Sequence, residues 1–148
     1  MRAHELPVDF LVYDRSGQLV AAVEAKRRLG TTEQWAAEFR AGVLEQTPLE
    51  DIPFFVLVVP DVIYIWTSTA PAIAPPGLKI DARIVFAPYY ERIEVDAAHI
   101  HPMAFETLVW WWLRDLTMGS DRTGDPRLEA AGFVSALAGG RLAQQDAA

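Results

Sequence analysis

Apolar residues alternate with small or polar ones in two short runs near the start of the chain, residues 8–13 and 19–25. Alternation of this kind, in β-branched and aliphatic residues, predicts β-strands. The segment between the runs, residues 14–18, reads DRSGQ and has the composition of a turn. The pattern therefore predicts a β-hairpin.

Two carboxylates interrupt the apolar pattern of this hairpin, Asp9 in the first strand and Glu24 in the second. If Ser16-Gly17 forms a two-residue loop, Asp9 lies directly opposite Glu24, and Lys26 follows on the same face. Opposed carboxylates repel each other, whereas a divalent cation between them would turn repulsion into ligation. A three-residue loop with a bulge would shift the register by one residue. A salt bridge between Lys26 and one carboxylate is the simpler alternative.

After the hairpin the pattern changes to the periodicity of a helix. Thr31 and Gln34 fit a capping box that opens a helix to about Leu44. The apolar face of this helix, which should pack on the sheet, consists of Trp35, Phe39 and Val43.

The next segments predict further strands joined by a long loop. Residues 54–59 form an unbroken apolar run, which is typical of a strand covered on both faces. Residues 62–66 predict the following strand, and the proline-rich residues 67–77 predict a loop. Residues 84–86 predict a short strand.

The last third of the chain predicts two helices, over residues 102–118 and 126–138. Trp110, Trp111 and Trp112 follow one another in the first of these helices and point about 100° apart. One apolar face cannot bury all three indoles. We therefore expect Trp110 and Trp111 to lie in a homo-oligomer interface, with a dimer as the simplest case; cover by the last helix is the alternative.

Composition and net charge limit the number of domains, the possible metal ligands and the partners of the protein. The chain has 148 residues, 51% of them hydrophobic, which suits a single domain over residues 1–138 with a frayed C-terminal tail over 139–148. It has no cysteine, so any metal ion must be bound by oxygen or imidazole. We expect a cytoplasmic protein, because no run suits a membrane span or a signal peptide. The net charge of −7 argues against broad attraction to nucleic acid.

The hairpin carries a motif that resembles a known family. Pro7 to Asp9, then fourteen residues, then Glu24-Ala25-Lys26 is similar to the PD-(D/E)xK signature of the restriction-endonuclease-like nuclease superfamily. The order of elements after the motif, a helix and then a buried strand, is also similar. The wider pattern resembles short prokaryotic members of that superfamily. The resemblance implies an α/β fold with a restriction-endonuclease-like mixed β-sheet flanked by helices.

The resemblance also implies a chemistry for the motif residues. Asp9 and Glu24 would bind Mg²⁺ or Mn²⁺, with the Ala25 carbonyl as a third ligand, and Lys26 would activate water or stabilise the transition state. These catalytic residues, Asp9, Glu24 and Lys26, would make the protein a metal-dependent nuclease that hydrolyses phosphodiester bonds, and we expect its substrate to be DNA rather than RNA.

Three further residues are candidates for contacts with nucleic acid. Arg27 and Arg28 continue the basic cluster that begins at Lys26. Gln34 is a candidate because several nuclease groups carry a glutamine near the site on the helix after the motif, although a capping role explains it more simply.

One departure from the superfamily affects the expected site. The superfamily core begins with a helix and a further strand before the Asp strand, but here only eight residues precede Asp9. We therefore expect the N-terminal core helix to be reduced or absent, with its place left empty or taken by later segments or a second subunit. The alternative function is a non-catalytic nuclease-like module that acts in protein assembly or regulation through the tryptophan-rich surface.

Overall fold

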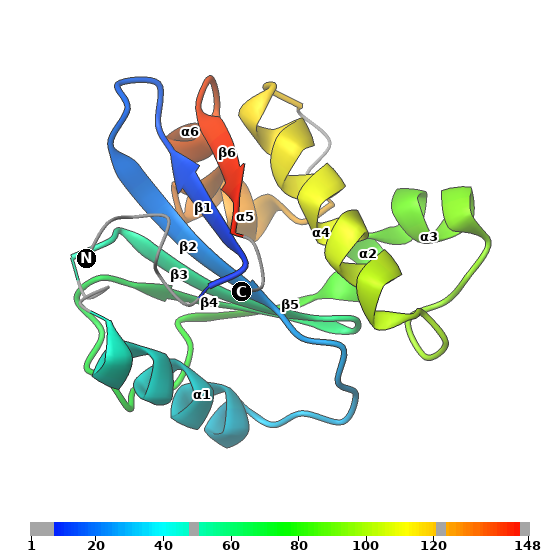
Figure 1. Ribbon diagram of the computed structural model, residues 1–148, viewed down its shortest axis with the longest axis horizontal. Coiled ribbons are helices and arrows are strands. Elements are labelled where there is room, and N and C mark those ends of the chain that lie inside the picture. Colours follow the sequence, from blue (N-terminus) through cyan, green and yellow to red (C-terminus); the bar gives the residue numbers. More distant parts are fainter. Residues whose placement is uncertain (1–7, 48–50, 121–123, 146–148) are drawn as a thin grey trace.

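A six-stranded sheet forms the centre of the protein in the computed structural model, which describes residues 8–47, 51–120 and 124–145. The elements in chain order are β1 (Phe10–Tyr13), β2 (Leu19–Ala25), α1 (Glu33–Gln46), β3 (Phe54–Val59), β4 (Val62–Thr67), β5 (Leu78–Asp81), α2 (Ala82–Val85), α3 (Ala87–Ile93), α4 (Pro102–Thr117), α5 (Pro126–Ala130), α6 (Phe133–Leu137) and β6 (Arg141–Gln144). The strand order across the sheet is β5-β4-β3-β2-β1-β6 (Figure 1).

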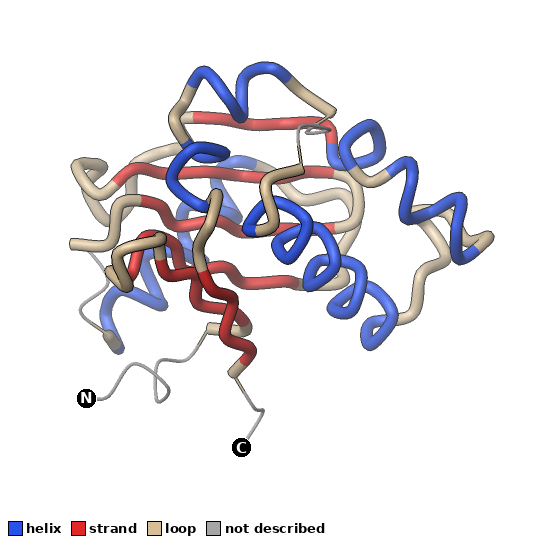
Figure 2. Tube along the Cα trace, turned by 90° about the horizontal axis from the view of Figure 1, so that it is seen from above, coloured by secondary structure: helices blue, strands red, loops and turns tan. Residues whose placement is uncertain are grey.

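The sheet is mixed, and helices cover both of its faces. β2 and β3 run parallel, with α1 as the connection between them, while the remaining neighbours run antiparallel. Apolar side chains of α1 pack on one face, and those of α2 to α6 pack on the other. Figure 2 shows α4 lying over the strands on that second face. The protein therefore has the mixed α/β architecture expected from the sequence.

The predicted hairpin is present, but its loop is one residue longer than expected. The Asp14 amide donates to the Gln18 carbonyl at 2.8 Å, which leaves residues 15–17 as a three-residue loop. A bulge at Val20 absorbs the extra residue. The pairs beyond it are Phe10 with Val23, Leu11 with Ala22, and Val12 with Ala21. The register expected for the open end of the hairpin is therefore kept.

Helix α1 begins one residue later than the predicted capping box. Thr32 rather than Thr31 is the N-cap, and its side chain accepts a hydrogen bond from the Trp35 amide at 3.0 Å. The Gln34 side chain instead donates to Glu38 on the exposed side of the helix, at 3.2 Å. The capping role predicted for Gln34 is wrong, because an N-cap at Thr32 places Trp35 at the third helical position.

The inner side of α1 contains an unexpected charge. The buried residues of the helix are Ala36, Ala37 and Arg40, while the predicted face of Trp35, Phe39 and Val43 is partly buried. Arg40 is only 2% exposed, and its guanidinium donates to the carbonyls of Pro71 (2.8 Å) and Ala70 (3.2 Å). These hydrogen bonds hold the loop between β4 and β5, residues 68–77, against the helix.

The region after this loop differs from the prediction. Strands β3 and β4 confirm the two predicted strands, but the short strand expected over residues 84–86 is wrong. Helix α2 begins at Ala82, because the Asp81 side chain accepts from the Arg83 amide at 3.0 Å and caps the helix. The strand in this region is β5, which ends at Asp81 and pairs with β4.

Helix α4 confirms the helix predicted over residues 102–118, with His101 as its N-cap. The second predicted helix, over residues 126–138, is broken into α5 and α6. Gly132 separates them with φ of 81°, a left-handed conformation that glycine adopts without steric cost. Both short helices cover the second face of the sheet, where Leu128, Phe133 and Leu137 are fully buried.

The C-terminal tail expected to be frayed over residues 139–148 contains strand β6, which pairs antiparallel with β1. This correction applies to residues 139–145, since the last three residues lie outside the described part. The prediction failed because the segment is short and partly polar, so its sequence alone does not indicate a strand. It forms a strand by hydrogen bonding to the edge of β1. The expectation that the N-terminal core helix is reduced or absent concerns residues 1–7, which lie outside the described range. Within the described residues, no helix is both long and apolar enough to cross a membrane.

Candidate functional site

The hairpin register brings Asp9 and Glu24 together as predicted. Phe10 pairs with Val23, and one further step along both strands places Asp9 beside Glu24. The backbone carbonyl of Asp9 accepts from the Gln145 amide at 2.7 Å, so the Asp9 backbone turns toward β6. Asp9 and Glu24 therefore form a pair without backbone hydrogen bonds between them, the arrangement in which opposed side chains lie closest.

Glu24 is a buried carboxylate that forms an ion pair with Lys26 and lies beside Asp9. The residue is 5% exposed and lies on the face of the sheet that α1 covers. Its Oε1 lies 3.2 Å from the Nζ of Lys26. Its Oε2 is buried and has no hydrogen-bond partner among the described residues. Leaving an anionic oxygen in this state is costly, so the position is suited to a bound cation.

The surroundings of Glu24 raise its pKa to about 7 from an ordinary value of 4.5. Burial is the largest cause, because it removes water from the charged form. The negative charge of Asp9 raises the pKa further, and the positive charge of Lys26 opposes both effects. Glu24 therefore titrates near neutral pH, where a positive ion beside it would favour its charged form.

Asp9 is fixed in place by the neighbouring strand. Its Oδ2 accepts the Ala25 amide at 2.8 Å, and the residue is partly exposed. The N–H and C=O groups of one residue in a strand point to the same side. The Ala25 carbonyl, predicted as a third metal ligand, is therefore directed toward the side of β2 on which Asp9 lies.

Lys26 stands at the outer end of the site. Its side chain is 46% exposed, and its ammonium lies 5.6 Å from the centre of the Phe39 ring on α1. The group therefore contacts Glu24 while remaining open to a ligand from solvent. The structure thus brings together the three residues predicted as catalytic.

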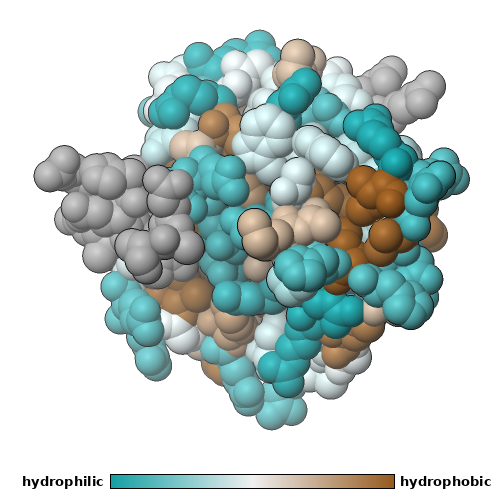
Figure 3. All heavy atoms as spheres, turned by 45° about the vertical axis from the view of Figure 1, so that its right-hand side comes forward, coloured by the Kyte–Doolittle hydropathy of each residue, from teal (hydrophilic) through white to brown (hydrophobic). Residues whose placement is uncertain are grey.

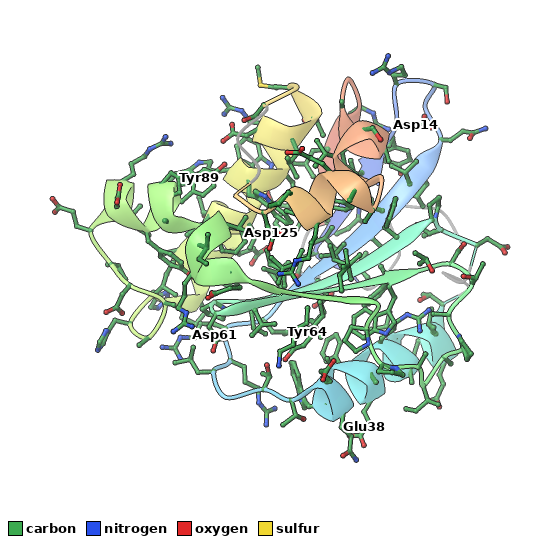
Figure 4. All side chains as sticks on the ribbon, turned by 180° about the vertical axis from the view of Figure 1, so that it is seen from behind. Asp14, Glu38, Asp61, Tyr64, Tyr89 and Asp125 are labelled. Carbon is green, nitrogen blue, oxygen red and sulfur yellow. The ribbon has the colours of Figure 1, made fainter. Side chains whose placement is uncertain are left out.

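The sheet continues the same row of residues beyond Glu24. Leu57 on β3 pairs with Glu24, and Tyr64 on β4 pairs with Leu57. Tyr64 points toward the α1 side of the sheet (Figure 4), and its hydroxyl lies 2.7 Å from Oγ1 of Thr31. Leu57 and Tyr64 are fully buried, so the row beyond Glu24 belongs to the core.

The residues predicted to contact nucleic acid lie in different settings. Arg27 faces away from the site: its Nε donates to the Ile100 carbonyl at 2.9 Å and its Nη2 to that of Ala98. Arg28 is exposed, with its guanidinium 5.0 Å from the Trp35 ring. Gln34 is also exposed. Of the two arginines, only Arg28 presents a guanidinium that is not already bonded to a loop carbonyl.

The predicted cofactor can be compared with the oxygen atoms at the site. No cluster of three or more His, Asp or Glu side chains that could hold a metal ion is found in the described part of the chain. Asp9 and Glu24 each keep one oxygen that is not engaged by Ala25 or Lys26. Mg²⁺ is commonly held by one or two carboxylates, with water and substrate phosphate as its other ligands. The two carboxylates, one of which keeps an oxygen without a hydrogen-bond partner among the described residues, therefore fit a divalent ion of this kind.

The tryptophans predicted to form an interface are partly covered by their own chain. Trp111 packs against Tyr89 with ring centres 6.3 Å apart, and Arg92 lies over both rings. Trp110 is partly buried, with Arg114 at 5.4 Å from its ring. Figure 3 brings forward the side of the molecule that carries α3, and hydrophobic surface there forms separate patches among hydrophilic residues. The homo-oligomer stays a prediction.

Sequence analysis missed the contribution of β6 to the site. This strand lies beside β1, on the side away from β2, and the Gln145 amide at its end donates to the Asp9 carbonyl. The resemblance to the nuclease superfamily rests on the motif and the order of elements alone. No protein-family model, curated protein or solved structure matches the chain.

Proposed function

We propose that this protein is a divalent-metal-dependent nuclease that hydrolyses phosphodiester bonds of DNA at Asp9, Glu24 and Lys26. The observation that supports this most is the state of Glu24. Its carboxylate is 5% exposed, adjoins a second carboxylate and keeps one oxygen without a partner. Such a group destabilises the fold unless it serves to bind a positive ion or a proton.

Each of the three residues has a distinct part in the proposed reaction. A bound Mg²⁺ or Mn²⁺ would supply Lewis-acid activation of the phosphate and of the attacking water. Asp9 and Glu24 would hold the ion, because Ala25 and Lys26 orient their carboxylates. The Lys26 ammonium, half exposed beside Glu24, offsets negative charge that develops on the phosphate in the transition state.

The surface around Lys26 supports a nucleic-acid substrate. Arg28 lies close to the indole of Trp35, and both belong to the segment that follows the motif. Arginine binds phosphate, and an aromatic ring offers a surface on which a base can stack. With a net charge of −7, the protein must rely on such a local contact rather than on overall attraction.

Cleavage assays test the proposal directly. Purified protein is incubated with single-stranded, duplex and branched DNA, and with RNA, in Mg²⁺, Mn²⁺ or a chelator. We expect cleavage of DNA only with the metal ions, and its loss in Glu24→Gln and Lys26→Ala. Lys79→Ala is the matched control, because Lys79 is the other lysine of the chain and lies on β5, three strands away. Cleavage that survives Lys26→Ala, or that is absent on every substrate, contradicts the proposal.

The second candidate is a non-catalytic module that acts in assembly through Trp110 and Trp111. The observation that favours it is that both indoles keep exposed surface although several groups pack around them. This candidate requires stable self-association in light scattering that Trp110→Ala abolishes and Lys26→Ala does not alter. A monomer at all concentrations contradicts the self-association it requires.

A further inference from the structure

Strand β6 carries a residue into the same row as the two carboxylates. Phe10 pairs with Gln144, and the next pair along these antiparallel strands is Asp9 with Gln145, joined by the backbone bond of 2.7 Å. Directly opposed residues of an antiparallel pair project to the same face, with Cβ atoms about 4.5–5.5 Å apart. Asp9 therefore lies between Gln145 on one side and Glu24 on the other.

Gln145 shares an unusual property with Glu24. The side-chain Oε1 of Gln145 is buried and has no hydrogen-bond partner among the described residues, like Oε2 of Glu24. A buried acceptor left in this state costs about 1–3 kcal/mol. Two such acceptors flank Asp9, and both are oxygen atoms. A positive ion between them would satisfy both at once.

We propose that Gln145 supplies a third protein oxygen to the cation at Asp9 and Glu24, so that the C-terminal strand completes the site. The proposal rests on the metal site of the proposed function. Hard divalent cations accept amide oxygens together with carboxylates. A neutral amide adds a ligand without adding to the repulsion between Asp9 and Glu24, and two carboxylates already balance the charge of the ion.

The same strand offers a matched control. Gln144 precedes Gln145, is exposed, and projects to the opposite face, where its side chain donates to Glu106 of α4 at 3.3 Å. A substitution at Gln144 therefore disturbs β6 to a similar degree and leaves the row of Asp9 untouched.

Calorimetric titration with MnCl₂, and the shift of the unfolding temperature at saturating MnCl₂, test the proposal without reference to activity. We expect Gln145→Leu to weaken Mn²⁺ binding by about tenfold or more, the lower end of the loss seen when groups that support a metal site are removed. Gln145→Glu should bind at least as tightly as the native chain, because a carboxylate is also an oxygen ligand. Gln144→Leu should bind like the native chain.

The outcomes separate this proposal from the proposed function. If Asp9→Asn and Glu24→Gln abolish Mn²⁺ binding but Gln145→Leu does not weaken it, the role of Gln145 is overturned and the metal site stands. If Gln145→Glu loses binding, the amide acts as a hydrogen-bond donor to the carboxylates rather than as a ligand, which also overturns the proposal. If the native chain binds no Mn²⁺ at millimolar concentrations, both proposals fail.

Discussion

The unusual pKa of Glu24 makes a quantitative prediction about stability. Its pKa is raised to about 7 from 4.5, so the folded protein holds the proton more tightly than the unfolded chain does. The stability that this proton contributes is fully present below pH 4.5 and is lost as the pH rises toward 7. The difference between the two pKa values corresponds to about 3 kcal/mol.

Glu24→Gln keeps the shape of the side chain and removes its charge. In metal-free buffer we expect this variant to be more stable than the native chain by about 2–3 kcal/mol at pH 8, and by less than about 1 kcal/mol at pH 5. Urea unfolding followed by tryptophan fluorescence, at several pH values between 5 and 8, measures the difference. Glu45→Gln, an exposed position on α1, should change the stability by less than about 0.5 kcal/mol at any pH.

Two results would refute this reasoning. The first is a stability difference between Glu24→Gln and the native chain that is the same at pH 5 and pH 8. Glu24 would then titrate at its ordinary pKa. The other is a variant that is less stable than the native chain at pH 8 without metal. That result would mean that the ion pair with Lys26 outweighs the burial of the charge.

Three further predictions concern the elements that support the site. Gly140→Ala should destabilise the protein by several kcal/mol in urea unfolding, because a Cβ there would collide with the Tyr13 backbone carbonyl. In the same assay Gly42→Ala on α1 should stabilise the protein by about 0.5–1 kcal/mol, because a Cβ at that position meets no atom within 4 Å. Arg40→Ala should cost about 2–4 kcal/mol in the same assay and increase proteolysis within residues 67–77, because it leaves loop carbonyls without a donor. Thr32→Ala should cost about 1 kcal/mol through loss of the helix cap, and equal stability would contradict the assigned N-cap.

The parts of the fold that the sequence predicted are those in which the local pattern and the tertiary environment agree. The hairpin strands and β3 are rich in apolar residues because helices cover both faces of the sheet, so consecutive residues of these strands are buried. The opposition of Asp9 and Glu24 was predicted through a loop of the wrong length. The bulge at Val20 compensated for the error, so the geometry of the site was right although one step toward it was not.

The parts that were missed depend on distant partners. Residues 84–86 are apolar enough for a strand, but the Asp81 side chain caps a helix that begins at Ala82. The chain is therefore already helical at residues 84 and 85. Strand β6 has no local signal, since its identity comes from the free edge of β1. The sequence alone therefore could not predict Gln145 as a site residue, because Gln145 lies beside Asp9 only when β6 pairs with β1.

Anomalous diffraction from crystals soaked in MnCl₂ tests the central claim most directly, because it locates the ion without assuming any activity. We predict a manganese peak within bonding distance of one oxygen of Asp9 and of the Oε2 of Glu24. A peak located elsewhere, or no peak at these carboxylates at a pH above 7, would contradict the metal site and with it the proposed hydrolysis.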